Sequence, residues 1–234
     1  MRQIAAIWSK EFKDYFVSPI AYMVIAIFLL ITGWFFFSSF FVQGQASMRS
    51  FFQLLPLIFA FVIPALTMRL FSEEFNMGTY EMLITLPVTL RQVVVGKFLA
   101  GLAFVAAMLL PTLAYPLCIS LIAKLDWGPV IGGYIGALLL GGAFTAIGLL
   151  TSAITHNQII AFILGTLFCF ALAIVDKMLF FFPESFLDVI QYFAADYHFQ
   201  NIAKGIIDSR DLLYFLSLIF IGQYVTHLLL QARE

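Results

Sequence analysis

The sequence predicts an all-α fold, that of a polytopic membrane protein with six transmembrane helices. Of its 234 residues, 63% are hydrophobic and only 11% are charged, whereas about 25% of the residues of a typical soluble domain are charged. The mean hydropathy is +1.03, and the apolar residues form long runs. A soluble globule of this size would expose large apolar patches to water. The composition therefore excludes a soluble enzyme, a nucleic-acid-binding protein and a disordered chain.

Charge and cysteine content indicate no metal, redox or nucleic-acid site. Twelve basic and thirteen acidic residues leave a net charge of −1, so no polybasic patch is expected. Cys118 and Cys169 lie inside apolar runs, without a CxxC spacing or a nearby histidine cluster. We interpret them as small buried residues.

Residues 1–18 predict an amphipathic helix at the membrane interface. Its apolar residues recur at every fourth position and so share one helical stripe. They are Ile4, Trp8, Phe12 and Phe16. A helix packed on a soluble partner is the alternative. The apolar run that follows is longer than the roughly 7–15 residues of a signal-peptide core, so we expect an uncleaved first span.

Six apolar stretches approach the length of about 20 residues that a helix needs to cross a bilayer. The predicted spans are 20–42, 51–70, 98–122, 128–154, 159–182 and 212–230. Only residues 155–158 separate the fourth span from the fifth, which predicts a tight helical hairpin. Prolines inside the second and third spans predict kinks, which membrane helices tolerate where neighbours satisfy the freed carbonyls. These prolines are Pro56, Pro64, Pro111 and Pro116.

Basic residues in the loops set the expected orientation. The side that holds both termini carries seven, namely Arg2, Lys10, Lys13, Arg69, Arg91, Lys97 and Arg233. The other side carries five, namely Arg49, Lys124, Lys177, Lys204 and Arg210. We therefore place both termini in the cytoplasm.

The most polar cytoplasmic stretch is the loop 72–90. Gly78 is expected to end the helix that leaves the second span, because glycine is unfavourable in a helix interior. Thr79 can cap a new short helix over 80–86, and Pro87 limits that helix. Its apolar side suits docking into a groove of a partner. The alternative is a helix lying on the bilayer, which three acidic residues disfavour: Glu73, Glu74 and Glu81.

Recognisable catalytic or nucleotide-binding motifs are missing from the sequence. There is no GxSxG or HExxH pattern, and Gly96-Lys97 lacks the upstream glycine of a phosphate-binding loop. Charged residues are almost absent from the span interiors, where ion-coupled transporters usually need them. We therefore expect a non-catalytic chain that draws its energy from another subunit.

Several short segments carry a resemblance to a known family. They are Phe71-Ser-Glu-Glu, Gly78-Thr-Tyr-Glu-Met-Leu, Thr85-Leu-Pro-Val and Gly96-Lys-Phe. These resemble the signature of ABC-2 type transporter permeases, whose loop at this place is a coupling helix. Further segments, including Ser18-Pro-Ile-Ala-Tyr and Gly205-Ile-Ile-Asp-Ser-Arg-Asp, are similar to the gliding-motility-associated GldF-like branch.

The resemblance implies a single permease domain over 1–234 and a set of partners. Two ABC ATPase subunits would bind below a pair of permease subunits, identical or different. ATP and Mg would be bound by the ATPase, with no cofactor in this chain. The branch implies a large periplasmic auxiliary protein. The implied ATPase-coupling residues are Glu73, Glu74, Gly78, Thr79, Glu81, Leu83 and Pro87.

Two other features allow more than one interpretation. Small residues at every fourth position of the fourth span, Gly133, Ala137 and Gly141, permit close helix approach, within the subunit or at a dimer interface. The external loop 183–211 contains five residues that suit contact with a periplasmic partner: Tyr197, His198, Asp208, Arg210 and Asp211. The alternative is that the last three form a hydrated cap at the start of the sixth span.

The leading functional hypothesis is a permease subunit that couples ATP hydrolysis by a separate subunit to export across the inner membrane. A second hypothesis is a mechanotransmitter, which passes the conformational change to a periplasmic protein without moving a substrate. An intramembrane enzyme is disfavoured, because no nucleophile or metal-ligand set is visible.

Overall fold

The computed structural model describes residues 2–43, 47–85, 87–181, 191–206 and 208–233, and these contain helices and no strand. Among them, six helical segments are long and apolar enough to span a membrane, which confirms the predicted fold class. These segments are Pro19–Val42, Arg49–Met77, Leu90–Ile122, Trp127–Ile154, Gln158–Met178 and Ser209–Gln231.

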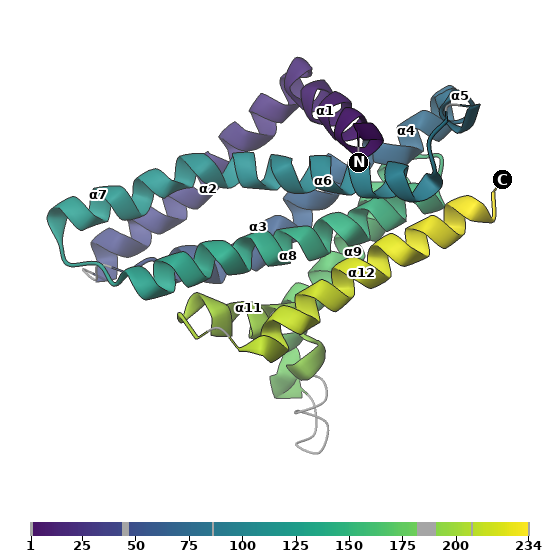
Figure 1. Cartoon of the computed structure of the whole chain (residues 1–234). Helices are drawn as coiled ribbons and strands as arrows, with labels where there is room; N and C mark the ends of the chain where they lie inside the picture. Colours follow the sequence, from purple (N-terminus) through teal and green to yellow (C-terminus); the bar gives the residue numbers. More distant parts are fainter. Residues whose placement is uncertain (1, 44–46, 86, 182–190, 207, 234) are drawn as a thin grey trace.

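Figure 1 shows the helices in their order along the chain. The first half contains α1 (Arg2–Val17), α2 (Pro19–Gln43), α3 (Arg49–Thr67), α4 (Arg69–Met77), α5 (Thr79–Thr85) and α6 (Leu90–Leu109). The second half contains η1 (Leu110–Leu113), α7 (Ala114–Ile122), α8 (Trp127–Ile154), α9 (Gln158–Ile174), η2 (Val175–Phe181), α11 (Ala195–Ala203) and α12 (Ser209–Gln231).

Helix boundaries differ from the predicted spans at three places. The helix of the third span begins at Leu90 rather than at 98, so it includes Lys97. The second span is interrupted at Met68 and continues as α4. The fifth span is described as apolar helix to Met178, and residues 182–190 lie outside the described residues. The predicted proline break is confirmed at Pro111, where η1 separates α6 from α7. In contrast, α3 stays helical through Pro56 and Pro64, and α7 stays helical through Pro116.

Helix α8 is the centre of the molecule. It packs against α3, α4, α6, α9, α11 and α12, and 72% of its span is buried, against 22% for the span of α2. Glycines make this packing possible, because a Cβ at Gly133 would lie 2.3 Å from the ring of Phe52 and one at Gly141 would lie 2.7 Å from Val105. The α8–α9 turn confirms the predicted hairpin.

Helix α1 packs lengthwise on α6 of the same chain. A Cβ at Gly96 would lie 2.8 Å from the side chain of Ile7. The ring of Tyr15 lies 4.9 Å from that of Phe104. Trp8 keeps 38% of its surface exposed. Ile7 and Tyr15 therefore fix α1 to the bundle, and the contact of its exposed side with the membrane interface or with a partner stays a prediction.

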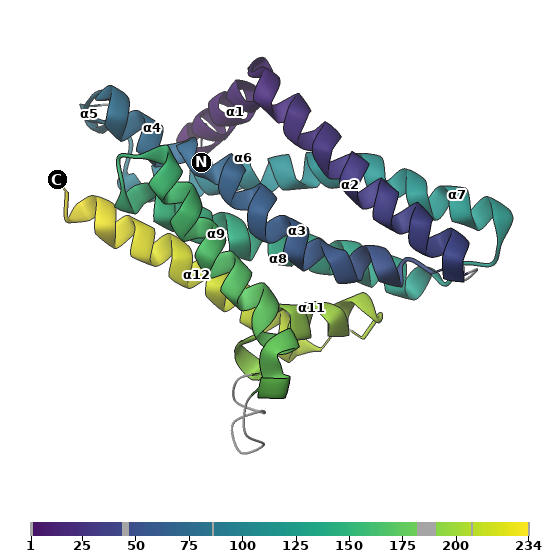
Figure 2. The ribbon, with the colours of Figure 1, turned by 180° about the vertical axis from the view of Figure 1, so that it is seen from behind.

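The two ends of the bundle differ in what they carry. Both views place the chain termini together with α4 and α5 at one end, and α11 at the other (Figures 1 and 2). Two hydrogen bonds agree with this placement of the chain termini. Gln3 Nε2 donates to the carbonyl oxygen of Pro87 at 2.5 Å, and Arg233 Nη2 donates to that of Ile154 at 2.7 Å.

Candidate functional site

Gly78 forms a sharp turn between α4 and α5. Gly78 has a φ of +69°, a left-handed conformation that side-chain-bearing residues rarely adopt. Its N–H donates to the carbonyl oxygens of Glu74 and Phe75, which ends α4. Thr79 begins α5, and its hydroxyl lies 3.4 Å from the Glu74 carbonyl oxygen. The predicted break at Gly78 and the predicted short helix are confirmed. Thr79, however, is the first residue of α5 rather than the cap before it, and its hydroxyl donates back to Glu74.

This α4–α5 turn, residues 77–82, projects from the bundle at the end that holds the chain termini (Figure 1). Met77 is 68% and Met82 is 73% exposed, and Gly78, Thr79 and Glu81 are exposed as well. Two large exposed apolar side chains beside an exposed carboxylate form a surface suited to another protein.

The base of the turn is built on Phe75. Its ring packs edge-on against Tyr80 of α5 at 4.8 Å and lies 5.2 Å from the ring of His156 in the α8–α9 turn. The guanidinium of Arg233, near the C-terminus, lies 4.6 Å above the same ring. Phe75 therefore joins α4, α5, the α8–α9 turn and the chain end.

The other end of α4 is held by a side chain from α8. Ser152 Oγ accepts hydrogen bonds from the N–H groups of Phe71 at 3.0 Å and Ser72 at 3.1 Å. It donates in turn to the carbonyl oxygen of Met68 at 2.8 Å. A helix start leaves such N–H groups without an intrahelical partner, and an inserted side chain is a recognised cause of a break between helices. Ser152 thus defines the α3–α4 junction.

Between these ends, α4 is tied to two other helices by Lys97. Its ammonium group donates to Glu11 Oε1 of α1 at 3.0 Å, to Glu74 Oε1 of α4 at 2.7 Å and to the Leu70 carbonyl oxygen at 2.7 Å. It also lies 5.1 Å from the ring centre of Phe71. Lys97 is 1% exposed, so its charge is balanced by these groups rather than by water. We call this arrangement the Lys97 node.

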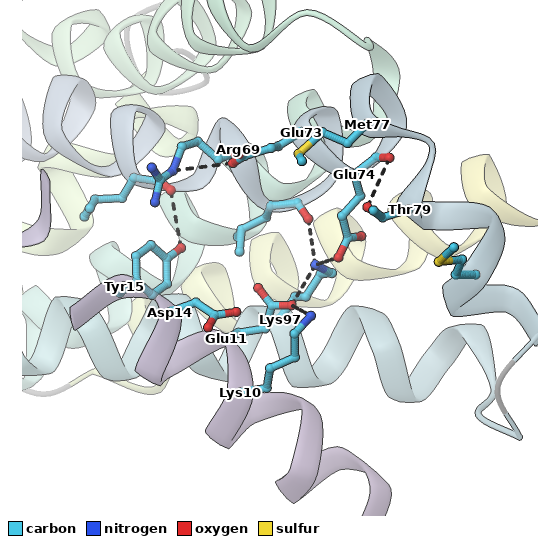
Figure 3. A pocket seen from close by; sticks show the side chains of 13 residues that line it. Lys10, Glu11, Asp14, Tyr15, Arg69, Glu73, Glu74, Met77, Thr79 and Lys97 are labelled. Carbon is cyan, nitrogen blue, oxygen red and sulfur yellow. Dashed lines mark hydrogen bonds and ion pairs between the residues drawn. The ribbon is translucent and has the colours of Figure 1, made fainter. Parts of the chain in front are cut away.

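The node forms the floor of a cleft of about 560 Å³, here the α4 cleft (Figure 3). Thirteen residues line it: Lys10, Glu11, Asp14, Tyr15, Leu66, Arg69, Leu70, Glu73, Glu74, Met77, Thr79, Met82 and Lys97. The cleft therefore opens between α1, α4 and the α4–α5 turn, with Lys97 of α6 at its base.

Polar contacts on the walls of the α4 cleft also fix α1 and α4. Tyr15 donates to the carbonyl oxygen of Leu66 at 3.3 Å. Burial, and secondarily the carboxylate of Glu11, raises the pKa of Tyr15 well above its usual range, so its hydroxyl stays a donor. Arg69 and Glu73 pair along α4 at 3.8 Å. In the part of the chain that the structure describes, no group of three His, Cys, Asp or Glu side chains is placed to hold a metal ion.

The predicted coupling residues fall into two groups. Gly78, Thr79, Glu81 and Pro87 are exposed, while Glu74 is turned inward and bound to Lys97. Glu73 lies between these extremes, with 42% of its side chain exposed. Leu83 lies in α5, and its side chain is outside what the structure describes.

The small-residue row of the fourth span packs inside the subunit. Gly133, Ala137 and Gly141 are buried within the single chain, against Phe52 of α3 and Val105 of α6 in the case of the two glycines. Of the two interpretations left open by the sequence, the described contacts are those of packing within the subunit.

The residues predicted to contact a periplasmic partner also differ in their surroundings. Asp208 caps α12 by accepting from the N–H of Arg210 at 3.0 Å, which is the helix-cap alternative. His198 and Asp211 are buried and face each other, with Nδ1 and Oδ1 2.6 Å apart. Tyr197 is half-buried and lines a cleft, described below, while Arg210 is exposed.

Sequence reasoning missed Lys97, Glu11 and Ser152. Lys97 was counted as a loop cation, because hydropathy alone separates a lysine from a membrane span. Its partners lie 86 and 23 residues away, and Ser152 is 84 residues from Met68. One signal was available: Lys97 and Gly96 directly precede a long apolar run, so helical periodicity extends the third span back through both residues.

Comparison with known families covers most of the chain. The family model described as ABC-2 family transporter protein matches residues 5–219. A comparison with curated proteins finds no match. The matched range begins in α1 and ends in α12, so it includes the α4–α5 turn, the Lys97 node and the α4 cleft.

Proposed function

The chain belongs to the ABC-2 transporter family and is a membrane permease subunit of an ABC transporter, and we propose that its α4–α5 turn is the docking site of a separate ATPase subunit. The observation that carries the proposal is the pairing of this exposed turn with the buried node beneath it. Met77 and Met82 offer apolar contact outside, while Glu74, four residues before Gly78, is bonded to Lys97 inside.

The charges of the turn suit a basic partner surface. Glu81 is exposed in the first turn of α5, and Glu73 is 42% exposed. Complementary charges across an interface favour the correct partner and speed its association. Glu74 has a different part in the proposal: it links the docked turn to Lys97.

Mechanical coupling follows from the same contacts. α4 is a short helix with the docking turn at one end and the Ser152 junction at the other. When ATP-driven movement of the ATPase displaces the turn, the Glu74–Lys97 and Glu11–Lys97 contacts carry the displacement to α6 and α1. α6 packs in turn on α8 and α12, so the movement reaches the centre of the bundle.

The rest of the assembly follows the family pattern as part of this proposal. Two ATPase subunits, which bind the ATP and Mg, serve a pair of permease subunits, identical or different. Both termini then lie in the cytoplasm beside the turn, the chain resides in the bacterial inner membrane, and transport runs outward as export. A large periplasmic auxiliary protein of the gliding-motility-associated type is the expected further partner.

Charge reversal at the turn tests the proposal. The chain is co-expressed with an ABC ATPase encoded beside it, and the complex is purified and assayed for nucleotide hydrolysis. Glu81→Arg is expected to lower both co-purification and the dependence of hydrolysis on the membrane subunit. Lys13→Glu, which reverses an exposed charge on α1, is the matched control and should leave both unchanged.

Wild-type co-purification and hydrolysis in Glu81→Arg would contradict docking at the turn. An accompanying transport assay with labelled lipid or polymer separates export from the mechanotransmitter alternative, in which hydrolysis is coupled but no substrate crosses the membrane.

A further inference from the structure

A second cleft, here the α11 cleft, lies at the end of the bundle opposite the α4–α5 turn. It has a volume of about 460 Å³, within the range of small-molecule sites. Its ten lining residues come from α3, η2, α11 and the segments on either side of α11. They are Arg49, Gln53, Asp176, Lys177, Gln191, Asp196, Tyr197, Gln200, Asn201 and Lys204. In a chain that is 63% hydrophobic, such a cluster of polar side chains indicates a candidate binding site.

In the α11 cleft, both carboxylate oxygens of Asp196 already have partners within the chain. The carboxylate of Asp196 is 3% exposed and pairs with Lys177 through Oδ2, while its Oδ1 accepts from Gln200 Nε2 at 3.1 Å. These contacts cancel the charge of Lys177 and anchor η2 to α11. Asp196 and Lys177 therefore serve as the fixed floor of the cleft rather than as free binding groups.

Three charged side chains remain for a ligand. Arg49 and Lys204 are exposed and form no ion pair with the residues that the structure describes. Asp176 interacts electrostatically with Lys177 and Lys204 without a direct pair. The free groups thus carry two positive charges and one negative charge, beside the amides of Gln53 and Asn201.

The wall formed by α11 is held rigidly. His198 Nε2 lies 2.9 Å from the carbonyl oxygen of Tyr192 and Nδ1 lies 2.6 Å from Asp211 Oδ1. These two contacts hold the imidazole ring of His198 between the segment before α11 and the start of α12. The ring of Tyr214 stacks on His198 at 4.1 Å. Because α11 supplies four of the ten lining residues, its fixation pre-organises the cleft.

We propose that the α11 cleft binds a phosphate group that carries neighbouring hydroxyls, as in a phosphoglycerol unit. Arg49 and Lys204 pair with the phosphate, for which a guanidinium offers a two-pronged contact. The carboxylate of Asp176 accepts a hydrogen bond from a hydroxyl, and the amides of Gln53 and Asn201 complete the shell. Arg49 begins the second span and Asp176 lies at the end of the fifth, which places the cleft at the level of lipid head groups.

Two sources offer this chemistry, a phospholipid head group and a soluble phosphate ester, and the test distinguishes them. The purified full chain, without any ATPase, is analysed by native mass spectrometry for retention of phosphatidylglycerol against phosphatidylcholine. Glycerol phosphate binding is measured in parallel by titration calorimetry. Retention of phosphatidylglycerol alone assigns the site to a lipid, and binding of glycerol phosphate assigns it to the phosphate ester itself.

The double variant Arg49→Gln/Lys204→Gln is expected to weaken binding about 25-fold, since each cation near a membrane surface contributes about fivefold. Lys124→Gln, an exposed lysine outside the lining of the α11 cleft, is the control and should bind like the wild type. Asp176→Asn is expected to keep phosphate binding while losing the preference for glycerol phosphate over inorganic phosphate.

Equal retention of both lipids together with no glycerol phosphate binding overturns the proposal, as does an equal loss in Lys124→Gln and the double variant. An unchanged preference in Asp176→Asn overturns the assignment of the hydroxyl contact. Because these measurements need no ATPase, their failure leaves the docking proposal for the α4–α5 turn unaffected, and failure of docking leaves this site unaffected.

Discussion

Removal of the ammonium group of Lys97 should destabilise the chain strongly. In Lys97→Met, the carboxylates of Glu11 and Glu74 lose their shared donor, and their Oε1 atoms stay within 6 Å of each other because both contacted the same nitrogen. At that separation, two negative charges repel by about 3 kcal/mol at an effective dielectric constant of about 20. The second oxygen of Glu74 is buried without a hydrogen bond among the described residues, so Lys97 is its main source of compensation.

The expected loss is about 3–5 kcal/mol in the free energy of unfolding, the range found when one partner of a buried ion pair is removed. The assay is equilibrium unfolding by sodium dodecyl sulfate in mixed micelles, followed by circular dichroism and tryptophan fluorescence. Lys10→Met is the matched control, because Lys10 is 64% exposed and contacts the same Glu11 carboxylate at 3.8 Å. An exposed pair of this kind contributes about 0–1 kcal/mol.

A triple variant separates charge imbalance from lost packing. Lys97→Met/Glu11→Gln/Glu74→Gln has no unbalanced charge, and a neutral replacement of a buried ion network is often tolerated. It should therefore regain most of the stability lost in Lys97→Met. The reasoning is refuted if Lys97→Met unfolds within about 1 kcal/mol of the wild type, or if the triple variant is no more stable than the single one.

Three further variants test the local geometry. Gly78→Ala keeps open space around its Cβ but forces alanine to a φ of +69°; the cost of about 1 kcal/mol should speed proteolysis of the turn roughly fivefold. Gly133→Ala meets the Phe52 ring at 2.3 Å and should lower the unfolding free energy by about 1–3 kcal/mol, unlike Gly128→Ala. Ser152→Ala leaves two N–H groups without their acceptor and should cost about 1–3 kcal/mol in the same unfolding assay.

Hydropathy was sufficient to predict the six spans, because each needs a run of about 20 apolar residues and few charged residues interrupt the apolar runs of this chain. It placed the start of α6 eight residues late. The first turns of that helix contain the polar residues Arg91, Gln92 and Lys97, which lower the hydropathy there. The helix nevertheless begins after Thr89, whose side chain forms a capping box with Gln92. Cap chemistry, rather than hydropathy, marks this boundary.

In the candidate site, too, features with local causes were predictable and features that depend on long-range packing were not. The turn was predictable, since the left-handed conformation of Gly78 ends α4 through its own backbone. The Lys97 node was not, because a lysine's partners on two other helices depend on how those helices pack. For the same reason, sequence assigned His198 and Asp211 to a partner-facing surface, whereas α11 and α12 bring them together in a buried pair.

The position of the node within α4 bears on how a docked ATPase would move the membrane helices. If α4 continued into α3 as one uninterrupted rod, a push on the turn would drive α3 directly. Ser152 instead inserts at Met68, where α3 gives way to α4, and so places a break between them. The contacts of Glu74 and Leu70 with Lys97 lie on the turn side of that break. The geometry therefore favours α6 and α1, rather than α3, as the first helices to follow the ATPase.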